Sequence, residues 1–269
     1  MAQSDRIMSD DFNGINPLAA PALYSLHYGK KHQDSVTVLA HDGSLMALEK
    51  LAHLEDKRTG FYADVMIDRS QGHAVILYKG MDVPFKNEGN GRTGFLRDAF
   101  TAAQSLITGA KNWQTPFAEK IYLDTINNPD VKSVEVVGFS LGTLHANYIA
   151  AKYGVKGTVL ADLGIANRGL KNIFNDNARD VDAAKNHLKN NLTDLRMELD
   201  PVSWLGFFRH RGNVIGLDRG RNPDPEGILH LSENYNKNAQ KLMTEKPHII
   251  APDIVYAGAY KRTPAPGLA

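Results

Sequence analysis

Apolar residues along the chain fall into short runs that alternate with stretches of helical periodicity, and polar or glycine-containing turns separate them. Short runs rich in Val, Ile, Thr, Tyr and Phe are typical of strands. The sequence therefore predicts strands at 35–40, 60–68, 73–80, 134–137, 157–162 and 213–217. Residues 69–72 (R-S-Q-G) separate two of these runs and predict a hairpin turn.

Helical spacing of apolar side chains marks the segments between the strands. Helices are predicted at 95–107, about 143–153, 178–195 and 232–243. A strand, a helix and another strand follow one another across residues 134–162, which implies a right-handed crossover and parallel strands. The predicted fold class is therefore α/β, with a mostly parallel central sheet and an early antiparallel hairpin.

Length and composition suit one large domain. The chain has 269 residues, 42% of them hydrophobic, which is enough for a sizeable core in one α/β domain and short for two. Residues 1–34 are expected to form a loosely ordered or helical lead-in, and residues 259–269 a frayed tail. Residues 35–258 are predicted to form a single domain.

Charge and cysteine content exclude several functions. With 31 Lys and Arg against 30 Asp and Glu, the net charge of +1 creates no field that would attract nucleic acid. The chain has no cysteine, which excludes disulfides and thiolate catalysis. Its apolar runs are too short to span a membrane, and the N-terminus lacks a basic region followed by an apolar run. We therefore expect a cytoplasmic location, or export without a cleavable signal peptide.

The segment V-E-V-V-G-F-S-L-G-T-L-H (134–145) contains the pattern G-x-S-x-G, formed by Gly138, Ser140 and Gly142. A predicted strand precedes it and a predicted helix follows, which is the setting in which a tight turn presents a nucleophilic serine. The two glycines remove Cβ atoms that would clash there. The helix start would also point the Leu141 N–H at an oxyanion. The alternative is a glycine-tightened corner without a catalytic role.

A serine nucleophile of this type needs an acid and then a histidine further along the chain. Two downstream carboxylates have distinctive positions. Asp162 ends a predicted strand and would lie at the carboxyl edge of the sheet, where active sites gather. Asp200 precedes Pro201, whose ring fixes the backbone and would hold the carboxylate in one orientation.

Five histidines follow Ser140, at positions 145, 187, 210, 230 and 248. His145 lies on the outgoing helix, points away from the serine hydroxyl and is expected to be packed or on the surface. His187 belongs to a polar helix and is expected to be solvated. His230 follows the loop N-P-D-P-E-G and precedes a helix, which suits a general base that must reach Ser140. His210 is its main rival.

Several separated stretches together resemble the class 3 (fungal-type) lipases of the α/β-hydrolase superfamily and their bacterial lipase-like relatives. In that family a strand ending in Arg-Gly-Thr/Ser precedes the G-x-S-x-G turn, and Asp-Pro-Val, an aromatic residue before His-x-Gly, and a final His near a Tyr follow it. The matching stretches are H-A-V-I-L-Y-K-G-M-D (73–82), V-V-G-F-S-L-G (136–142), L-D-P-V-S (199–203), F-F-R-H-R-G-N-V (207–214) and L-H-L-S-E-N-Y (229–235). The resemblance covers roughly residues 60–240, in short islands.

The resemblance implies an α/β-hydrolase fold with helices on both faces of the sheet. Matched to the family's motifs, Ser140 becomes the nucleophile, Asp200 the acid and His230 the base, while His210 takes a packing role. No metal or organic cofactor is implied.

The resemblance also implies an oxyanion hole formed by the N–H groups of Leu141 and Met81. The chain departs from the family at this point, because Lys79, Gly80 and Met81 replace Arg-Gly-Thr/Ser. Methionine keeps the backbone N–H but lacks the side-chain hydroxyl that often assists. A weak or specialised enzyme would be consistent with this difference.

The expected activity is the hydrolysis of carboxylic esters, of lipase or phospholipase type and thus in lipid degradation, with acyl transfer to water through a Ser-Asp-His triad. The expected partners are an ester or lipid substrate and, transiently, a membrane surface, without nucleic acid; the oligomeric state is left open. Two alternatives remain. They are an esterase or thioesterase for small soluble substrates, and a catalytically silent hydrolase-like binding module.

Two segments are candidates for lipid contact. Residues 204–211 (W-L-G-F-F-R-H-R) place aromatic rings beside positive charge, which suits a membrane interface, although the favoured explanation is that the rings fill the core behind the loop of Asp200. The family places a lid in the segment that corresponds to 88–100, whose glycines would serve as a hinge. A helix packed permanently on the sheet is the alternative there.

Overall fold

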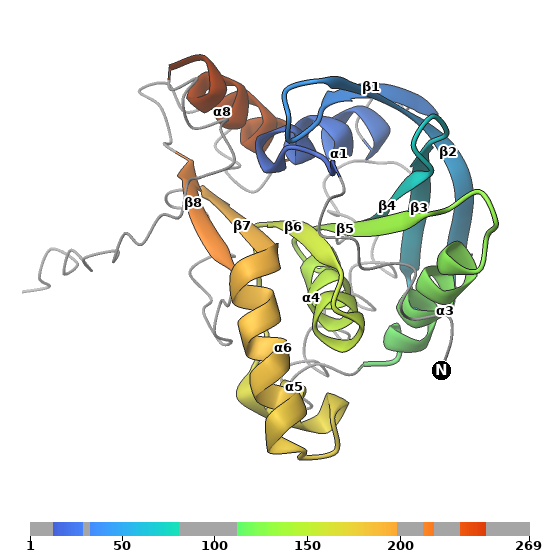
Figure 1. Cartoon of the computed structure of the whole chain (residues 1–269), viewed down its shortest axis with the longest axis vertical. Coiled ribbons are helices and arrows are strands. Elements are labelled where there is room, and N and C mark those ends of the chain that lie inside the picture. Colours follow the sequence, from blue (N-terminus) through green and yellow to red (C-terminus); the bar gives the residue numbers. More distant parts are fainter. Residues whose placement is uncertain (1–12, 29–32, 81–111, 198–211, 218–231, 246–269) are drawn as a thin grey trace, which may run out of the picture.

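The computed structural model of the chain describes residues 13–28, 33–80, 112–197, 212–217 and 232–245 (Figure 1). In these ranges eight strands form one sheet whose spatial order follows the chain order. Neighbours from β1 to β4 pair antiparallel, and neighbours from β4 to β8 pair parallel. The strands are β1 (Ser35–Leu39), β2 (Leu45–Asp56), β3 (Phe61–Asp68), β4 (His73–Tyr78), β5 (Ser133–Phe139), β6 (Lys156–Leu160), β7 (Leu192–Met197) and β8 (Asn213–Leu217).

Helices cover both faces of this sheet. Figure 1 shows α1 and α8 on one face and α3, α4, α5 and α6 on the other. The predicted architecture, a mixed sheet with an early antiparallel hairpin and helices on both faces, is confirmed. The helical elements are η2 (Pro17–Ala19), α1 (Ala20–Tyr28), α3 (Thr115–Ile126), α4 (Gly142–Tyr153), α5 (Asn167–Ile173), α6 (Ala178–Asn191) and α8 (Ser232–Glu245). None of those in the described ranges is long and apolar enough to cross a membrane.

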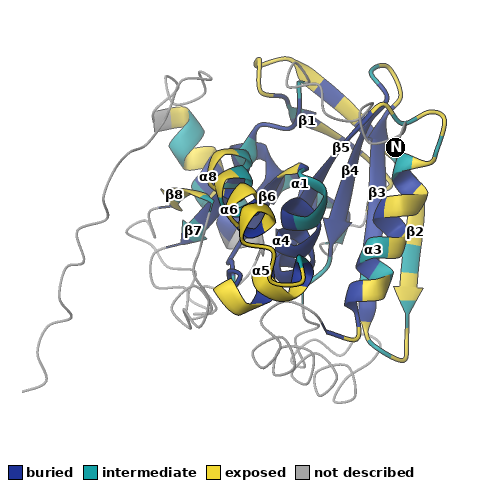
Figure 2. Cartoon of the chain, turned by 60° about the horizontal axis from the view of Figure 1, so that its bottom comes forward, coloured by how far each residue is buried: buried dark blue, intermediate teal, exposed yellow. Residues whose placement is uncertain are grey.

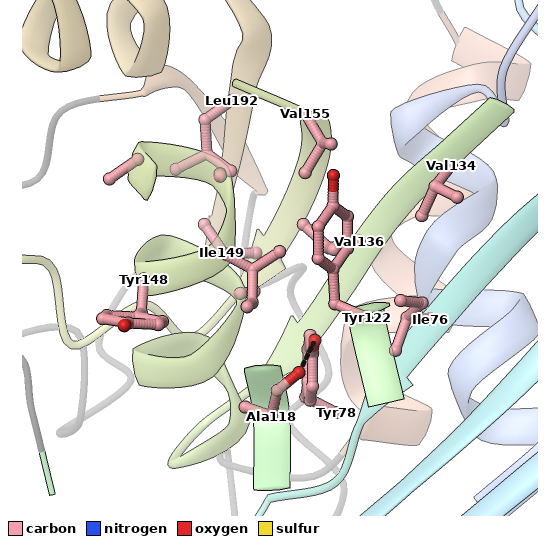
Figure 3. Packing of buried hydrophobic residues seen from close by; sticks show 14 of the residues in the cluster. Ile76, Tyr78, Ala118, Tyr122, Val134, Val136, Tyr148, Ile149, Val155 and Leu192 are labelled. Carbon is pink, nitrogen blue, oxygen red and sulfur yellow. Dashed lines mark hydrogen bonds between the residues drawn. The ribbon is translucent and has the colours of Figure 1, made fainter. Parts of the chain in front are cut away.

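The two central strands β4 and β5 are buried along their whole length (Figure 2). Their side chains alternate between two apolar clusters, as expected for strands covered on both faces. Ile76 and Val136 pack toward α3 and α4, where Figure 3 shows them among the cluster side chains. Leu77 and Val137 face the opposite cluster, which includes residues of α1. This two-sided burial makes β5 a rigid base for the turn that follows it.

Two strands were not predicted correctly from the sequence. β2 was not expected, because its sequence L-M-A-L-E-K-L-A-H-L-E-D is rich in helix formers. Pairing with β1 and β3 overrides that preference and buries Met46 and Leu48 on alternate positions. The predicted helix 178–195 was too long, since α6 ends at Asn191 and β7 follows at once. There Leu192, Leu195 and Met197 are buried by pairing with β6 and β8.

The other elements divide into those that were missed, those outside the described residues and those confirmed. Helix α3 was not predicted. The predicted helix 95–107 and the predicted tail 259–269 both lie outside the described residues. The first strand, the early hairpin, β8 and the closing helix α8 are confirmed in place.

The N-terminal segment packs against the sheet. Its residues 20–28 form α1, so one of the two states expected for the lead-in is observed, while the division into domains stays a prediction. The Ile15 N–H donates to Glu135 Oε1 at 2.8 Å, and Ile15 also bridges to Ala40 beside β1. A second anchor is the fully buried pair of His27 on α1 and Asp64 on β3, whose Nε2 and Oδ2 atoms lie 2.7 Å apart.

Asp64 gathers several cationic or protonatable groups. Burial alone would raise the pKa of this carboxyl, but hydrogen bonds with His27 and Lys50 outweigh the burial and hold the pKa at about 2. The Lys50 ammonium lies 3.0 Å from Asp64 Oδ1, and His53 Nδ1 lies 2.9 Å from the same oxygen. Through its contact with His27, the ionised Asp64 carboxylate therefore fixes the end of α1 to the antiparallel half of the sheet.

Candidate active site

Ser140 lies on the turn between β5 and α4, as the sequence predicted for the segment 134–145. Its φ of +53° places a non-glycine residue in the left-handed region, which is sparsely populated for such residues. Backbone strain of this kind persists only where surrounding contacts hold it, and it is frequent at functional sites. The side chain is 7% exposed, at the carboxyl end of a fully buried strand.

Three hydrogen bonds hold the Ser140 backbone in this conformation. Its N–H donates to the Leu160 carbonyl at the end of β6, at 2.9 Å. Its carbonyl accepts from the Thr143 N–H at 3.0 Å and from the Thr143 hydroxyl at 2.6 Å. All three use main-chain atoms of Ser140, which a change of its side chain leaves in place.

The two glycines of the pattern allow close packing between the strand, the turn and the helix. A Cβ on Gly138 would lie 2.7 Å from the Gly142 carbonyl oxygen and 2.9 Å from the Ala146 Cβ. A Cβ on Gly142 would overlap the Tyr78 carbonyl, with the carbonyl carbon 2.8 Å away. Side chains at these positions would therefore push α4 away from β4 and β5.

Gly80 brings the chain that leaves β4 alongside the serine. A Cβ on Gly80 would lie 3.2 Å from the Ser140 Cβ and 2.8 Å from the Phe139 carbonyl oxygen. The Gly80 N–H donates to the Tyr24 hydroxyl of α1 at 2.8 Å. Met81, the expected second oxyanion donor, follows Gly80 in the chain and lies outside the described residues.

Leu141, the other expected oxyanion donor, is the N-cap residue of α4 and is buried. N–H groups at a helix start lack an intrahelical acceptor, and that of Leu141 has no acceptor among the described residues. Such a group is suited to bind an anion. The Leu141 side chain joins an apolar cluster with Leu144, Leu163 and Ala166.

Asp162, one of the two candidate acids, supports the first turns of α4. The strand β6 ends at Leu160, two residues earlier than predicted, because Ala161 turns the chain with a φ of +54°. The fully buried Asp162 accepts from the Asn147 amide at 2.7 Å and from the Gly164 N–H at 2.9 Å, both at Oδ1. The Asn147 amide also donates to the Thr143 carbonyl at 2.8 Å. These contacts give Asp162 a structural role beside the turn 138–142 that carries Ser140, which is called the elbow below.

The remaining predicted site residues lie outside the described residues. They are Asp200, His230 and the rival His210, together with the candidate lipid-contact segments 88–100 and 204–211. In the chain, Asp200 comes three residues after β7 ends at Met197. His230 comes between the end of β8 at Leu217 and the start of α8 at Ser232. Their roles stay predictions.

His145 is packed inside the molecule, one of the two settings expected for it. Its Nε2–H donates to Gln114 Oε1 at 2.9 Å, and the Gln114 amide donates to the Thr59 carbonyl at 2.7 Å. Burial lowers the pKa of His145 to about 3, so the ring stays neutral near pH 7. The expectation of a solvated His187 was wrong, since it is half-buried and its Nε2–H donates to the Val155 carbonyl at 3.0 Å.

The low pKa of His145 predicts a loss of stability in mild acid. A histidine that ionises at pH 6.5 when unfolded and near pH 3 when folded binds more protons in the unfolded state between these values. Its contribution is complete above pH 6.5 and falls by up to about 1.4 kcal/mol per pH unit as the pH decreases. Urea unfolding from pH 6.5 to 4.5 should show a shallower pH dependence for His145→Asn than for the native protein; equal slopes would contradict the prediction.

A second arrangement of serine, histidine and carboxylate was not predicted. At the opposite end of β5, His73 Nδ1 lies 2.9 Å from Ser133 Oγ and Nε2 lies 2.9 Å from Glu135 Oε1. All three residues are buried, and the Glu135 carboxylate also accepts the Ile15 N–H. None of the described helices starts beside Ser133 to supply oxyanion donors. We therefore interpret this array as an anchor for the N-terminal segment.

Parallel strands, a serine in the left-handed region between a strand and a helix, and glycines that bring both into contact are features typical of the α/β-hydrolase fold. Among the described residues, no group of three or more His, Asp or Glu side chains is placed to hold a metal ion.

Comparisons with known proteins gave matches among solved structures alone. No protein-family model and no curated protein matches the chain. The solved structures that match include three fungal lipases. The Lip2 lipase from Yarrowia lipolytica is 11% identical, with 75% of this chain and 77% of that chain covered and a TM-score of 0.42. A triacylglycerol lipase from Penicillium expansum is 13% identical, with 76% and 81% covered and a TM-score of 0.40. The Rhizomucor miehei lipase, in a propeptide complex, is 13% identical, with 59% and 52% covered and a TM-score of 0.32. Residue roles cannot be transferred at such identities, so the site depends on the geometry of this chain.

Proposed function

We propose that the chain is a serine carboxylic-ester hydrolase of lipase or phospholipase type, with Ser140 as nucleophile, Asp200 as acid and His230 as base. One observation carries the proposal. Ser140 is held at a φ of +53° where a fully buried strand meets the start of a helix, and hydrogen bonds to its main-chain atoms help to keep it there. A turn of this kind is the setting that presents a serine hydroxyl for nucleophilic attack.

In the proposed reaction, His230 removes the Ser140 hydroxyl proton while Oγ attacks the carbonyl carbon of the ester. The N–H groups of Leu141 and Met81 stabilise the negative charge on the carbonyl oxygen. His230 then gives its proton to the leaving alcohol, and Asp200 supports the charged imidazole throughout. Water, activated by His230, attacks the acyl-enzyme and releases the acid and free Ser140.

The order of the strands supports the choice of Asp200 and His230. β5, β7 and β8 run parallel in one sheet, so their carboxyl ends lie along the same edge as Ser140. Asp200 and His230 belong to the connections that leave the carboxyl ends of β7 and β8. Catalytic groups of open α/β sheets gather at this edge.

An apolar acyl group is favoured by the surroundings of the elbow. The cluster of Leu141, Leu144, Leu163 and Ala166 starts at the residue next to Ser140. Apolar side chains beside the nucleophile stabilise a bound hydrocarbon chain by removing it from water. We therefore place esters of fatty acids ahead of small soluble esters and thioesters.

A fluorophosphonate probe tests the nucleophile, because it reacts with activated serines and leaves ordinary serine hydroxyls unmodified. We expect one label per chain, located at Ser140 by peptide mass analysis. The substrate class is tested with p-nitrophenyl esters from acetate to palmitate and with phosphatidylcholine vesicles. Faster turnover of the longer acyl chains is expected. A protein that takes no label and hydrolyses none of these esters would be a silent module, and turnover of acetate alone would favour the soluble esterase.

A further inference from the structure

Two tyrosines of α1 contact the end of β4 through their hydroxyl groups. The Tyr28 hydroxyl donates to the Leu77 carbonyl at 2.9 Å, and the Tyr24 hydroxyl accepts the Gly80 N–H at 2.8 Å. The tyrosines are four residues apart, so they lie one above the other on the same face of α1. The two contacts differ in the part of β4 that they reach.

Leu77 lies inside the sheet, where β3 and β5 pair with it on either side. Its position is therefore fixed whether or not Tyr28 binds its carbonyl. Gly80 lies beyond the last strand residue, Tyr78, and none of the strand pairs includes it. The Lys79 N–H still donates to the Tyr62 carbonyl at 3.1 Å, and one residue further the Tyr24 hydroxyl binds the Gly80 N–H.

Tyr24 also contacts the elbow. Its ring packs on Phe139, the residue before Ser140, with ring centroids 5.1 Å apart. The side chain is buried, as is Phe139. One residue of α1 therefore touches both parts of the site, the strand end that leads to Met81 and the strand end that leads to Ser140.

We propose that Tyr24 is a positioning residue for the oxyanion hole. The role rests on the proposed function, since it assumes that Met81 supplies an oxyanion donor. Glycine has wide conformational freedom, so no side-chain contacts of its own hold Gly80 in place. The hydrogen bond to Tyr24 constrains the Lys79–Gly80 peptide, and with it the Gly80 Cα from which the chain continues to Met81. Preorganised donors stabilise an oxyanion because they need no rearrangement during the reaction.

α1 itself is held by other contacts. His27 and Asp64 form a fully buried pair with 2.7 Å between Nε2 and Oδ2, and this contact does not depend on the hydroxyl of either tyrosine. The Tyr24 ring keeps its packing on Phe139 when only its hydroxyl is removed. Tyr24→Phe should therefore leave α1 in place and release the Gly80 N–H.

Steady-state kinetics on a p-nitrophenyl ester test the role, with Tyr28→Phe as the matched control on the same helix. For Tyr24→Phe we expect kcat to fall about 10–100-fold with KM nearly unchanged, below the roughly 10²–10³-fold that loss of a whole oxyanion donor costs. Tyr28→Phe should keep kcat within about twofold of the native value. Hydrogen exchange of the Gly80 amide should become faster in Tyr24→Phe and not in Tyr28→Phe.

The outcomes separate this inference from the proposed function. Native protein that hydrolyses esters, together with an unchanged kcat in Tyr24→Phe, would overturn the positioning role and leave the hydrolase proposal intact. Equal losses of kcat in the two variants would also overturn it, because they would indicate a general effect of α1. Native protein without ester hydrolysis or fluorophosphonate labelling would overturn both. Unchanged exchange of the Gly80 amide in Tyr24→Phe would show that the hydroxyl does not hold that peptide.

Discussion

Replacing Ser140 with alanine is expected to lower kcat for ester hydrolysis by about 10⁴–10⁶-fold, as loss of the nucleophile does in enzymes that use a catalytic triad. The hydrogen bonds that hold the turn use the backbone of Ser140, so the variant should fold. Thermal unfolding close to that of the native protein and absence of fluorophosphonate labelling would accompany the loss of activity.

Ser133→Ala is the matched control for this experiment. Ser133 is also buried and also lies beside a histidine and a carboxylate, but at the opposite end of β5. We expect it to keep the native kcat. Full activity in Ser140→Ala would refute the proposed nucleophile, and loss of activity in Ser133→Ala with an unchanged fold would indicate that the reactive serine was assigned to the wrong end of the strand.

Variants of the proposed partners extend the same prediction. Asp200→Asn and His230→Ala should each lower kcat by several orders of magnitude, and combining either with Ser140→Ala should add little, because the three residues act as a unit. A fully active Asp200→Asn enzyme would return the acid role to another carboxylate.

Replacing Gly142 with alanine is expected to destabilise the fold by roughly 3 kcal/mol or to prevent folding, since the added methyl group has no room. The obstacle is the Tyr78 carbonyl, which is backbone inside the sheet and cannot turn aside as a side chain would. Either α4 or the end of β4 must move, and the elbow lies between them. Urea unfolding measures the first effect, and a lower rate of fluorophosphonate labelling of the folded protein measures the second.

Gly216→Ala on β8 is the control for added volume at a glycine. No atom of the described residues lies within 4 Å of the position that the added methyl group would take, and the residue does not need a positive φ. Its free energy of unfolding should change by less than about 0.5 kcal/mol. If Gly142→Ala were as stable as Gly216→Ala, the close approach of α4 to β4 would not require a glycine at position 142.

The elbow could be predicted from sequence because the residues that shape it are neighbours in the chain. Gly138 and Gly142 flank Ser140 within five positions, and the buried strand before them is marked by valines. β2 could not be predicted in this way, because its residues favour a helix and its strand conformation comes from pairing with β1 and β3. β7 was merged with the preceding helix because residues 178–197 contain no glycine or proline that would mark the end of the helix.

Contacts between distant residues account for what sequence reasoning missed at the site. The Gly80 N–H and the Tyr24 hydroxyl are 56 positions apart, and no local pattern connects them. His73 and Glu135 are likewise joined only by the pairing of β4 with β5. Asp162 was correctly placed near the sheet edge, but its bond to Asn147 depends on how α4 packs over β6.

The two ends of the described chain meet beside the nucleophile, which has a consequence for biosynthesis. Phe139 packs with Tyr24 from the N-terminal helix and with Tyr235 from α8, at centroid distances of 5.1 and 5.8 Å. A ribosome delivers α8 long after β5 and α4, so the side of Phe139 that Tyr235 covers stays uncovered until α8 has been made. We therefore expect nascent chains that stop before Ser232 to bind chaperones and to lack the reactivity proposed for Ser140.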